Sequence, residues 1–272
     1  MLHQRVLTAL LLAPLVIALI VFANTALFAF VVAVAFLAAL WEWAALSGLK
    51  SYPWRGALLA IAAVAMIALW ILRDSRVDIW VIALGVAWWL LVCIWLRHFA
   101  FGAAPTRENV ALKLLAGLFV TLPAWTALVN MHGRMPAGHW WVLLALLVVW
   151  AADIGAYTSG RTFGKRKLAP QISPGKTWAG AYGALLAGAV VMLIGAWLLG
   201  VRDRRLLGIL VLALVTVAIS IVGDLLESLM KRHAKVKDSG TLFPGHGGLM
   251  DRLDSVFAAL PVFAVGLLWL EI

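Results

Sequence analysis

The sequence is poor in charged residues and almost free of cysteine. Only 12% of its 272 residues are Asp, Glu, Lys or Arg, and just 12 of them are acidic. A soluble domain usually carries about 25% charged residues, so the composition excludes a soluble globular enzyme and a disordered chain. The single cysteine, Cys93, excludes a framework of intrachain disulfides. Alternating strand patterns, heptads and low-complexity linkers are also missing from the sequence.

Hydrophobic residues, by contrast, make up 65% of the chain. They form nine runs that are long enough to cross a bilayer as helices of about 20 residues. The predicted spans cover residues 6–22, 26–46, 56–72, 79–96, 112–130, 139–157, 178–200, 206–229 and 253–270. We therefore predict an all-α, polytopic integral membrane protein with about nine transmembrane helices. The first run is long for a signal sequence and a second span follows at once, so we expect the first helix to remain uncleaved.

The basic residues predict an orientation in the membrane. Sixteen of the 22 Lys and Arg residues fall on the side of the N-terminus, and six fall on the other side. Because basic loops favour the cytoplasm, we expect the N-terminus inside and the C-terminus outside. Ten of the sixteen lie in two long loops where chemistry can also require them, so the orientation depends partly on the site. The net charge of +10 then reflects topology and anionic phosphates or lipids, and we expect no nucleic-acid partner.

The acidic residues are gathered in the C-terminal half. Six of the twelve lie at or beside two predicted inner loops, 158–177 and 231–252. A charged residue inside a span costs about 2.5–3.5 kcal/mol and is kept mainly where a partner or a function requires it. We therefore predict one membrane domain with an N-terminal helical scaffold, 1–135, and a catalytic half, 136–272, whose active site faces the cytoplasm.

Five carboxylates in this half are candidate metal ligands, and they are Asp153, Asp224, Glu227, Asp251 and Asp254. Asp224 and Glu227 share one helical face with Ser228 and Lys231, because these residues are spaced by three, four and seven positions. A salt-bridge ladder at a helix end would explain one such carboxylate, but explains the group less well. Hard oxygen ligands without Cys or clustered His suit Mg²⁺ rather than zinc.

The first loop ends in a predicted phosphate-binding segment. Ser173, Lys176 and Thr177 lie just before the seventh span, where free N–H groups and the helix dipole favour anions. Its Gly-Lys-Thr resembles the end of a Walker A loop, but the first glycine of that motif would fall on Pro170 and no strand is predicted before it, so we reject a P-loop. The neighbouring Lys-Arg-Lys at 165–167 fits lipid headgroups or topology equally well.

Residues 228–254 resemble the signature of the phosphatidate cytidylyltransferases, also called CDP-diacylglycerol synthases. That pattern runs Ser, two residues, Lys-Arg, four residues, Lys-Asp, a small residue two positions further on, Pro-x-His-Gly-Gly and Asp-Arg-x-Asp. Here it is met by Ser228, Lys231, Arg232, Lys237, Asp238, Gly240, Pro244, His246, Gly247, Gly248, Asp251, Arg252 and Asp254. Residues 153–157 and 173–177 also resemble upstream segments of the family. The N-terminal half resembles it only in length and number of spans.

The resemblance implies that the cytidylyl group of CTP is transferred to phosphatidic acid, giving CDP-diacylglycerol and pyrophosphate. It makes Asp224 and Asp251 the main ligands of two metal ions, of which one is Mg²⁺ and the second need not be. The bases are expected to hold phosphates, while His246 donates a hydrogen bond to one. The resemblance also implies the bacterial cytoplasmic (inner) membrane, with lipid around the site, and a homodimer.

Two other functions remain open at this point. Another CTP-dependent membrane lipid kinase would need similar metal and phosphate sites, but should lack the full signature. A transporter of phosphorylated anions should carry inverted repeats with polar sites in both halves. We find no such repeat, and the polar residues crowd one half of the sequence.

Overall fold

The described part of the chain is almost entirely helical. The computed structural model describes residues 2–240 and 247–272, with side chains from Leu12 onward. The helices are α1 (Leu2–Phe22), α2 (Thr25–Leu46), α3 (Tyr52–Ile71), α4 (Val77–Trp95), α5 (Arg107–His132), α6 (Gly138–Phe163), α7 (Trp178–Leu198), α8 (Arg205–Ala234) and α9 (Met250–Trp269). Eight of them, α2 to α9, are long and apolar enough to cross a membrane. The prediction of an all-α, polytopic membrane protein is confirmed.

Several helices begin where a polar side chain caps the backbone. Asn24 accepts a hydrogen bond from the Leu27 N–H at 2.9 Å at the start of α2. Thr106 caps α5 in the same way, and Thr177 caps α7. Such caps satisfy N–H groups that have no partner within the helix. These caps therefore fix the residues at which α2, α5 and α7 begin.

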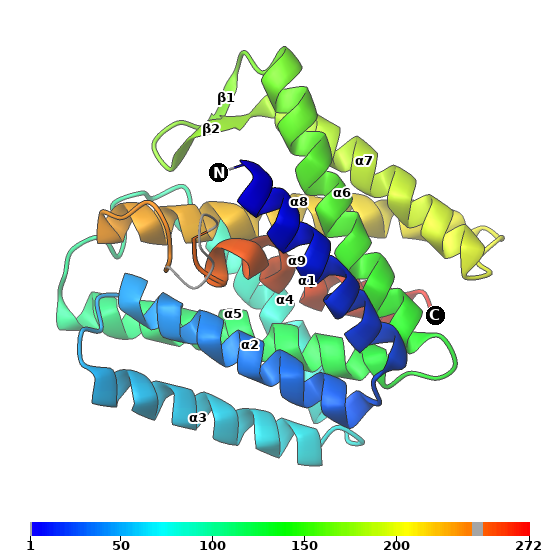
Figure 1. The fold of residues 1–272 in the computed structure, drawn as a ribbon, viewed down its shortest axis with the longest axis horizontal. Helices are drawn as coiled ribbons and strands as arrows, with labels where there is room; N and C mark the ends of the chain where they lie inside the picture. The colour runs from blue at the N-terminus through cyan, green and yellow to red at the C-terminus, as the bar shows by residue number, and fades with distance from the viewer. Residues whose placement is uncertain (1, 241–246) are drawn as a thin grey trace.

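Most of the described helices lie in three groups. In Figure 1, α8 and α9 cross the middle, α6 and α7 pair on one side, and α2, α3 and α5 lie on the other. Within the most apolar 18 residues of each helix, 67% are buried in α5 and 61% in α9, against 17% in α3. Helices α5 and α9 are therefore the centre of the bundle, and α3 presents most of its surface outward. Figure 1 also places the beginning of α1 and the end of α9 on opposite sides of the bundle.

Helices α6 and α8 extend well past their predicted ends, which corrects the bounds of the two inner loops. Helix α6 continues to Phe163 rather than residue 157, and α8 continues to Ala234 rather than residue 229. The added turns are polar, so they lack the hydropathy of a span although their backbone remains helical. The loops predicted at 158–177 and 231–252 are therefore shorter, and part of each is helix.

The first of these loops contains a β-hairpin, which the sequence did not predict. Strands β1 (Lys167–Ala169) and β2 (Ser173–Thr177) pair antiparallel, with Lys167 opposite Thr177 and Ala169 opposite Ser173. The segment shows no apolar alternation, and two prolines interrupt it. The expectation that no strand precedes the Gly-Lys-Thr segment was therefore wrong, although the rejection of a P-loop still rests on Pro170. The hairpin projects from the bundle where α6 ends and α7 begins (Figure 1).

Candidate active site

The hairpin holds a lysine against α8. Strand β2 ends at Thr177, whose hydroxyl accepts a hydrogen bond from the Gly180 N–H at 3.1 Å and so starts α7. The preceding residue, Lys176, forms an ion pair with Asp224. At the turn of the hairpin, the Ile172 carbonyl accepts a hydrogen bond from Nε of Arg232 at 3.1 Å. The predicted phosphate-binding segment is thus attached to the polar end of α8 at two points.

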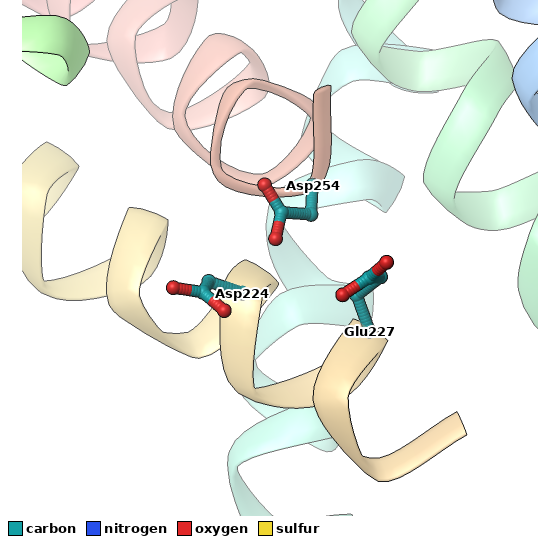
Figure 2. Close-up of side chains that lie close together, drawn as sticks. All are labelled: Asp224, Glu227 and Asp254. Atoms are coloured by element: carbon teal, nitrogen blue, oxygen red, sulfur yellow. The ribbon is translucent and has the colours of Figure 1, made fainter. Parts of the chain in front are cut away.

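Three carboxylates from α8 and α9 converge beside this lysine. Each of Asp224, Glu227 and Asp254 contributes one oxygen to a group whose atoms all lie within 4.8 Å of one another, and Figure 2 shows the three side chains around one gap. Helix α9 can approach α8 closely here because residue 223 is glycine. A Cβ at Gly223 would collide with the Asp254 carbonyl oxygen and the Ala258 side chain. We call these three residues the carboxylate cluster.

Lys231 neutralises two carboxylates at the edge of the cluster. Its Nζ lies 2.5 Å from Oε2 of Glu227, one helical turn earlier, and 2.6 Å from Oδ1 of Asp251 on α9. The side chain of Glu227 is only 1% exposed and that of Asp251 10%. A buried ion pair of this kind contributes mainly by keeping two charges from standing unpaired.

The other oxygen of Asp251 binds the loop that leads into α9. Oδ2 accepts hydrogen bonds from the backbone N–H and the hydroxyl of Ser239, at 2.9 and 2.8 Å, and from the Gly248 N–H at 2.8 Å. Gly247 has a φ of 82°, and a Cβ there would lie 2.7 Å from the same oxygen. The glycines of the signature thus let the backbone fold around Asp251.

A cavity opens between α6, the hairpin, α7 and α8. Its volume is about 350 Å³, and its walls include small residues such as Ala156 and Gly180. Four charged residues line it, namely Asp153, Arg161, Lys176 and Asp224. The cavity is therefore apolar along much of its wall and charged where it meets the carboxylate cluster.

The remaining predicted residues take different positions. The Ser228 hydroxyl donates a hydrogen bond to Asp224 at 3.4 Å, and Ser173 begins β2. Lys237 and Asp238 are exposed in the loop after α8, and Arg252 is exposed in the first turn of α9. His246 and Pro244 lie outside the described residues. The structure therefore brings the five predicted carboxylates, with Lys176 and Lys231, into one region at the end of α8.

One buried carboxylate at the site was not predicted to take part. Glu42, near the end of α2, accepts hydrogen bonds from the backbone N–H groups of Leu249 and Met250. It also lies within hydrogen-bonding distance of the Ser239 hydroxyl. The available signal was a single acidic residue in a 22-residue apolar helix. An unpaired charge in a span predicts a partner, but the sequence does not identify that partner.

Comparison with known proteins decides the family. The model of the cytidylyltransferase family matches residues 3–270, nearly the whole chain. The chain belongs to the cytidylyltransferase family. A member from Pseudomonas aeruginosa, named phosphatidate cytidylyltransferase, is 42% identical over 99% of this chain and 97% of its own. A Haemophilus influenzae member of the same name is 36% identical over 97% and 98%, and one from Staphylococcus haemolyticus is 45% identical over 47% and 49%. The family resemblance seen in the signature is therefore confirmed, and it extends through the N-terminal half of the chain.

Proposed function

We propose that the protein transfers the cytidylyl group of CTP to phosphatidic acid. A phosphate oxygen of phosphatidic acid would attack the α-phosphorus of CTP as the bond from that phosphorus to the oxygen bridging to the β-phosphate breaks. The products are CDP-diacylglycerol and pyrophosphate. The observation that carries the proposal is the contact between Lys176, near the end of β2, and Asp224 of the carboxylate cluster, beside a cavity with apolar walls. Cationic and carboxylate groups thus lie together beside apolar walls, which supports a site for an anionic lipid headgroup.

The side chains suit this chemistry without a strong base. The attacking phosphate is already an anion, so no serine or cysteine needs to be deprotonated. The site has instead to hold two anionic substrates in line and to stabilise the charge on the leaving pyrophosphate. We assign phosphate binding to Lys176, Lys231 and Arg232, while Lys237 and Arg252 steady the loop or the pyrophosphate.

The carboxylate cluster fits a divalent cation, which we expect to be Mg²⁺. Its donors are all carboxylate oxygens, the ligands that this cation prefers. Among the described residues, five carboxylates, counting Asp153 and Asp251, lie near three cations, Lys176, Lys231 and Arg252. A bound cation would balance this excess of negative charge, and it would supply charge neutralisation at the reacting phosphates. Asp224, Glu227 and Asp254 are the residues that we expect to hold it. Asp251 is engaged by Lys231, Ser239 and Gly248, so its role as a main ligand and the second metal ion stay predictions.

The proposed function is tested with purified protein and two preparations of CTP, one labelled in the α-phosphate and the other in the γ-phosphate. With the label in the α-phosphate, we expect radioactivity to enter the lipid only when phosphatidic acid is present. We expect EDTA to stop the incorporation and Mg²⁺ to restore it. If label in the γ-phosphate entered the lipid instead, the protein would be a lipid kinase. Movement of a phosphorylated anion across sealed vesicles without any CTP turnover would favour a transporter.

We further propose that the hairpin faces the cytoplasm and that the loop between α7 and α8 faces the opposite side of a bacterial inner membrane. Lys165 and Asp203 are exposed and mark the two sides. In a Cys93→Ala background, Asp203→Cys should react with a membrane-impermeant maleimide in spheroplasts. Lys165→Cys should react only after the membrane is opened. Labelling of both positions in spheroplasts would contradict this topology.

A homodimer, which the family resemblance implies, also stays a prediction.

A further inference from the structure

Glu42 connects the N-terminal half of the chain to the candidate active site. It lies in the last turns of α2 and is 8% exposed. Its Oε1 accepts a hydrogen bond from the Leu249 N–H at 3.1 Å, and its Oε2 accepts one from the Met250 N–H at 2.8 Å. Both oxygens are thus used by the residues where α9 begins. A carboxylate at this place satisfies N–H groups that the helix leaves free, and it complements the positive end of the helix dipole.

Two described glycines before α9, Gly240 and Gly248, lie against this carboxylate. A Cβ added to Gly240 or Gly248 would collide with the carboxylate of Glu42. Gly248 also donates its N–H to Asp251 at 2.8 Å. The backbone therefore passes close to both acidic side chains, and only residues without a side chain permit this approach.

Ser239 joins Glu42 to Asp251. Its buried hydroxyl lies 2.9 Å from Oε2 of Glu42 and 2.8 Å from Oδ2 of Asp251. From Asp251 the contacts continue through Lys231 to Glu227 of the carboxylate cluster. A continuous series of polar contacts thus runs from α2 to the cluster. Asp254, one turn after Asp251, belongs to the helix whose start Glu42 holds.

We propose that Glu42 is a positioning residue for the transfer reaction. It holds the start of α9 and the loop before it, so that Asp251 orients Lys231 and α9 presents Asp254 to the other two carboxylates. Glu42 does not line the cavity beside Lys176 and therefore acts through these neighbours. This inference rests on the proposed function, because the effect is measured on that reaction.

The test replaces Glu42 without removing its volume. Glu42→Gln keeps the shape of the side chain but has only one acceptor oxygen. In the wild type, the N–H groups of Leu249 and Met250 bind one oxygen each. We expect kcat to fall about 10- to 100-fold, the range for residues that orient catalytic or metal-binding groups. The KM for phosphatidic acid should stay within about threefold, since Glu42 does not line the cavity. Glu42→Asp, which restores both acceptor oxygens, should recover part of the lost rate.

A second readout does not depend on activity. Hydrogen exchange of the backbone amides at 248–251 should become faster in Glu42→Gln, because the Leu249 and Met250 N–H groups lose an acceptor. The matched control is Asp78→Asn. Asp78 is also a buried carboxylate of the N-terminal half, but it accepts a hydrogen bond from Asn130 near the opposite end of the bundle. It should leave both kcat and the exchange at 248–251 unchanged.

The outcomes separate this inference from the proposed function. If the wild-type protein forms no CDP-diacylglycerol, the proposed function fails. If the wild type is active and Glu42→Gln keeps its kcat within twofold, the inference about Glu42 is overturned. It is equally overturned if Asp78→Asn loses as much activity, because Glu42 would then support only the general stability of the bundle.

Discussion

Replacing Asp224 by Asn is expected to lower the rate of CDP-diacylglycerol formation by more than about 100-fold. Asp224 belongs to the carboxylate cluster, pairs with Lys176 of the hairpin and accepts a hydrogen bond from Ser228. Loss of its charge removes one ligand of the expected cation and leaves Lys176 without its partner. Residues that only orient metal ligands typically contribute 10- to 100-fold, so a direct ligand should exceed that range. Incorporation of α-labelled CTP into lipid measures the effect.

The control for this experiment is Asp74→Asn. The side chain of Asp74 is 86% exposed, and it pairs with the neighbouring Arg73 at the opposite end of the bundle. Its replacement should leave the rate within twofold of the wild type. Raising the concentration of Mg²⁺ should recover part of the lost rate in Asp224→Asn if the defect is in cation binding. Near-normal activity of Asp224→Asn at low Mg²⁺ would contradict the assignment of Asp224 as a ligand.

Replacing Lys231 by Met should be the most damaging single change to stability at the site. The lysine lies between Glu227 and Asp251, and both carboxylates are largely withdrawn from solvent. Breaking a buried ion pair by removal of one partner costs about 3–5 kcal/mol, because the remaining charge has no compensation. We therefore expect the free energy of unfolding to fall by about this amount and the transfer activity to be lost.

Unfolding in mixed micelles with increasing SDS measures the stability of this variant. Lys50→Met is a suitable control, because Lys50 is exposed after the end of α2 and should contribute little. A Lys231→Met protein as stable as the wild type would mean that Glu227 and Asp251 are held by other groups. The double variant Lys231→Met with Glu227→Gln should recover part of the stability, since one of the two unpaired charges is then removed.

The sequence predicted the helices well because a bilayer demands long apolar runs. The spans predicted at 26–46 and 178–200, for example, correspond to Thr25–Leu46 and Trp178–Leu198. Prediction failed where a helix leaves the apolar region. The last turn of α8 contains Lys231, Arg232 and His233, which resemble a polar loop in composition although the helix continues to Ala234. Hydropathy reports the surroundings of a residue, whereas the helix depends on backbone hydrogen bonds.

The candidate site was predicted as a set of residues but not as a set of contacts. The signature identifies Asp251 and Asp254, and helical spacing places Asp224 and Glu227 on one face with Lys231. The pairing of Lys176 with Asp224 could not be predicted, since it depends on a hairpin with no apolar alternation. Nor could the position of Glu42, which lies 208 residues before Met250. A single sequence does not indicate which helices pack together.

This long separation has a consequence for how the protein is made. Helix α2 is synthesised well before α9, because 208 residues separate Glu42 from Met250. The partners of Asp224 and Glu227 are synthesised at nearly the same time as these residues or earlier. Lys176 precedes both, and Lys231 follows within the same helix. Glu42 has to wait for Leu249 and Met250 before its charge is satisfied. A nascent chain that stops before α9 therefore keeps an unsatisfied carboxylate in α2, and α9 completes the surroundings of a helix made long before it.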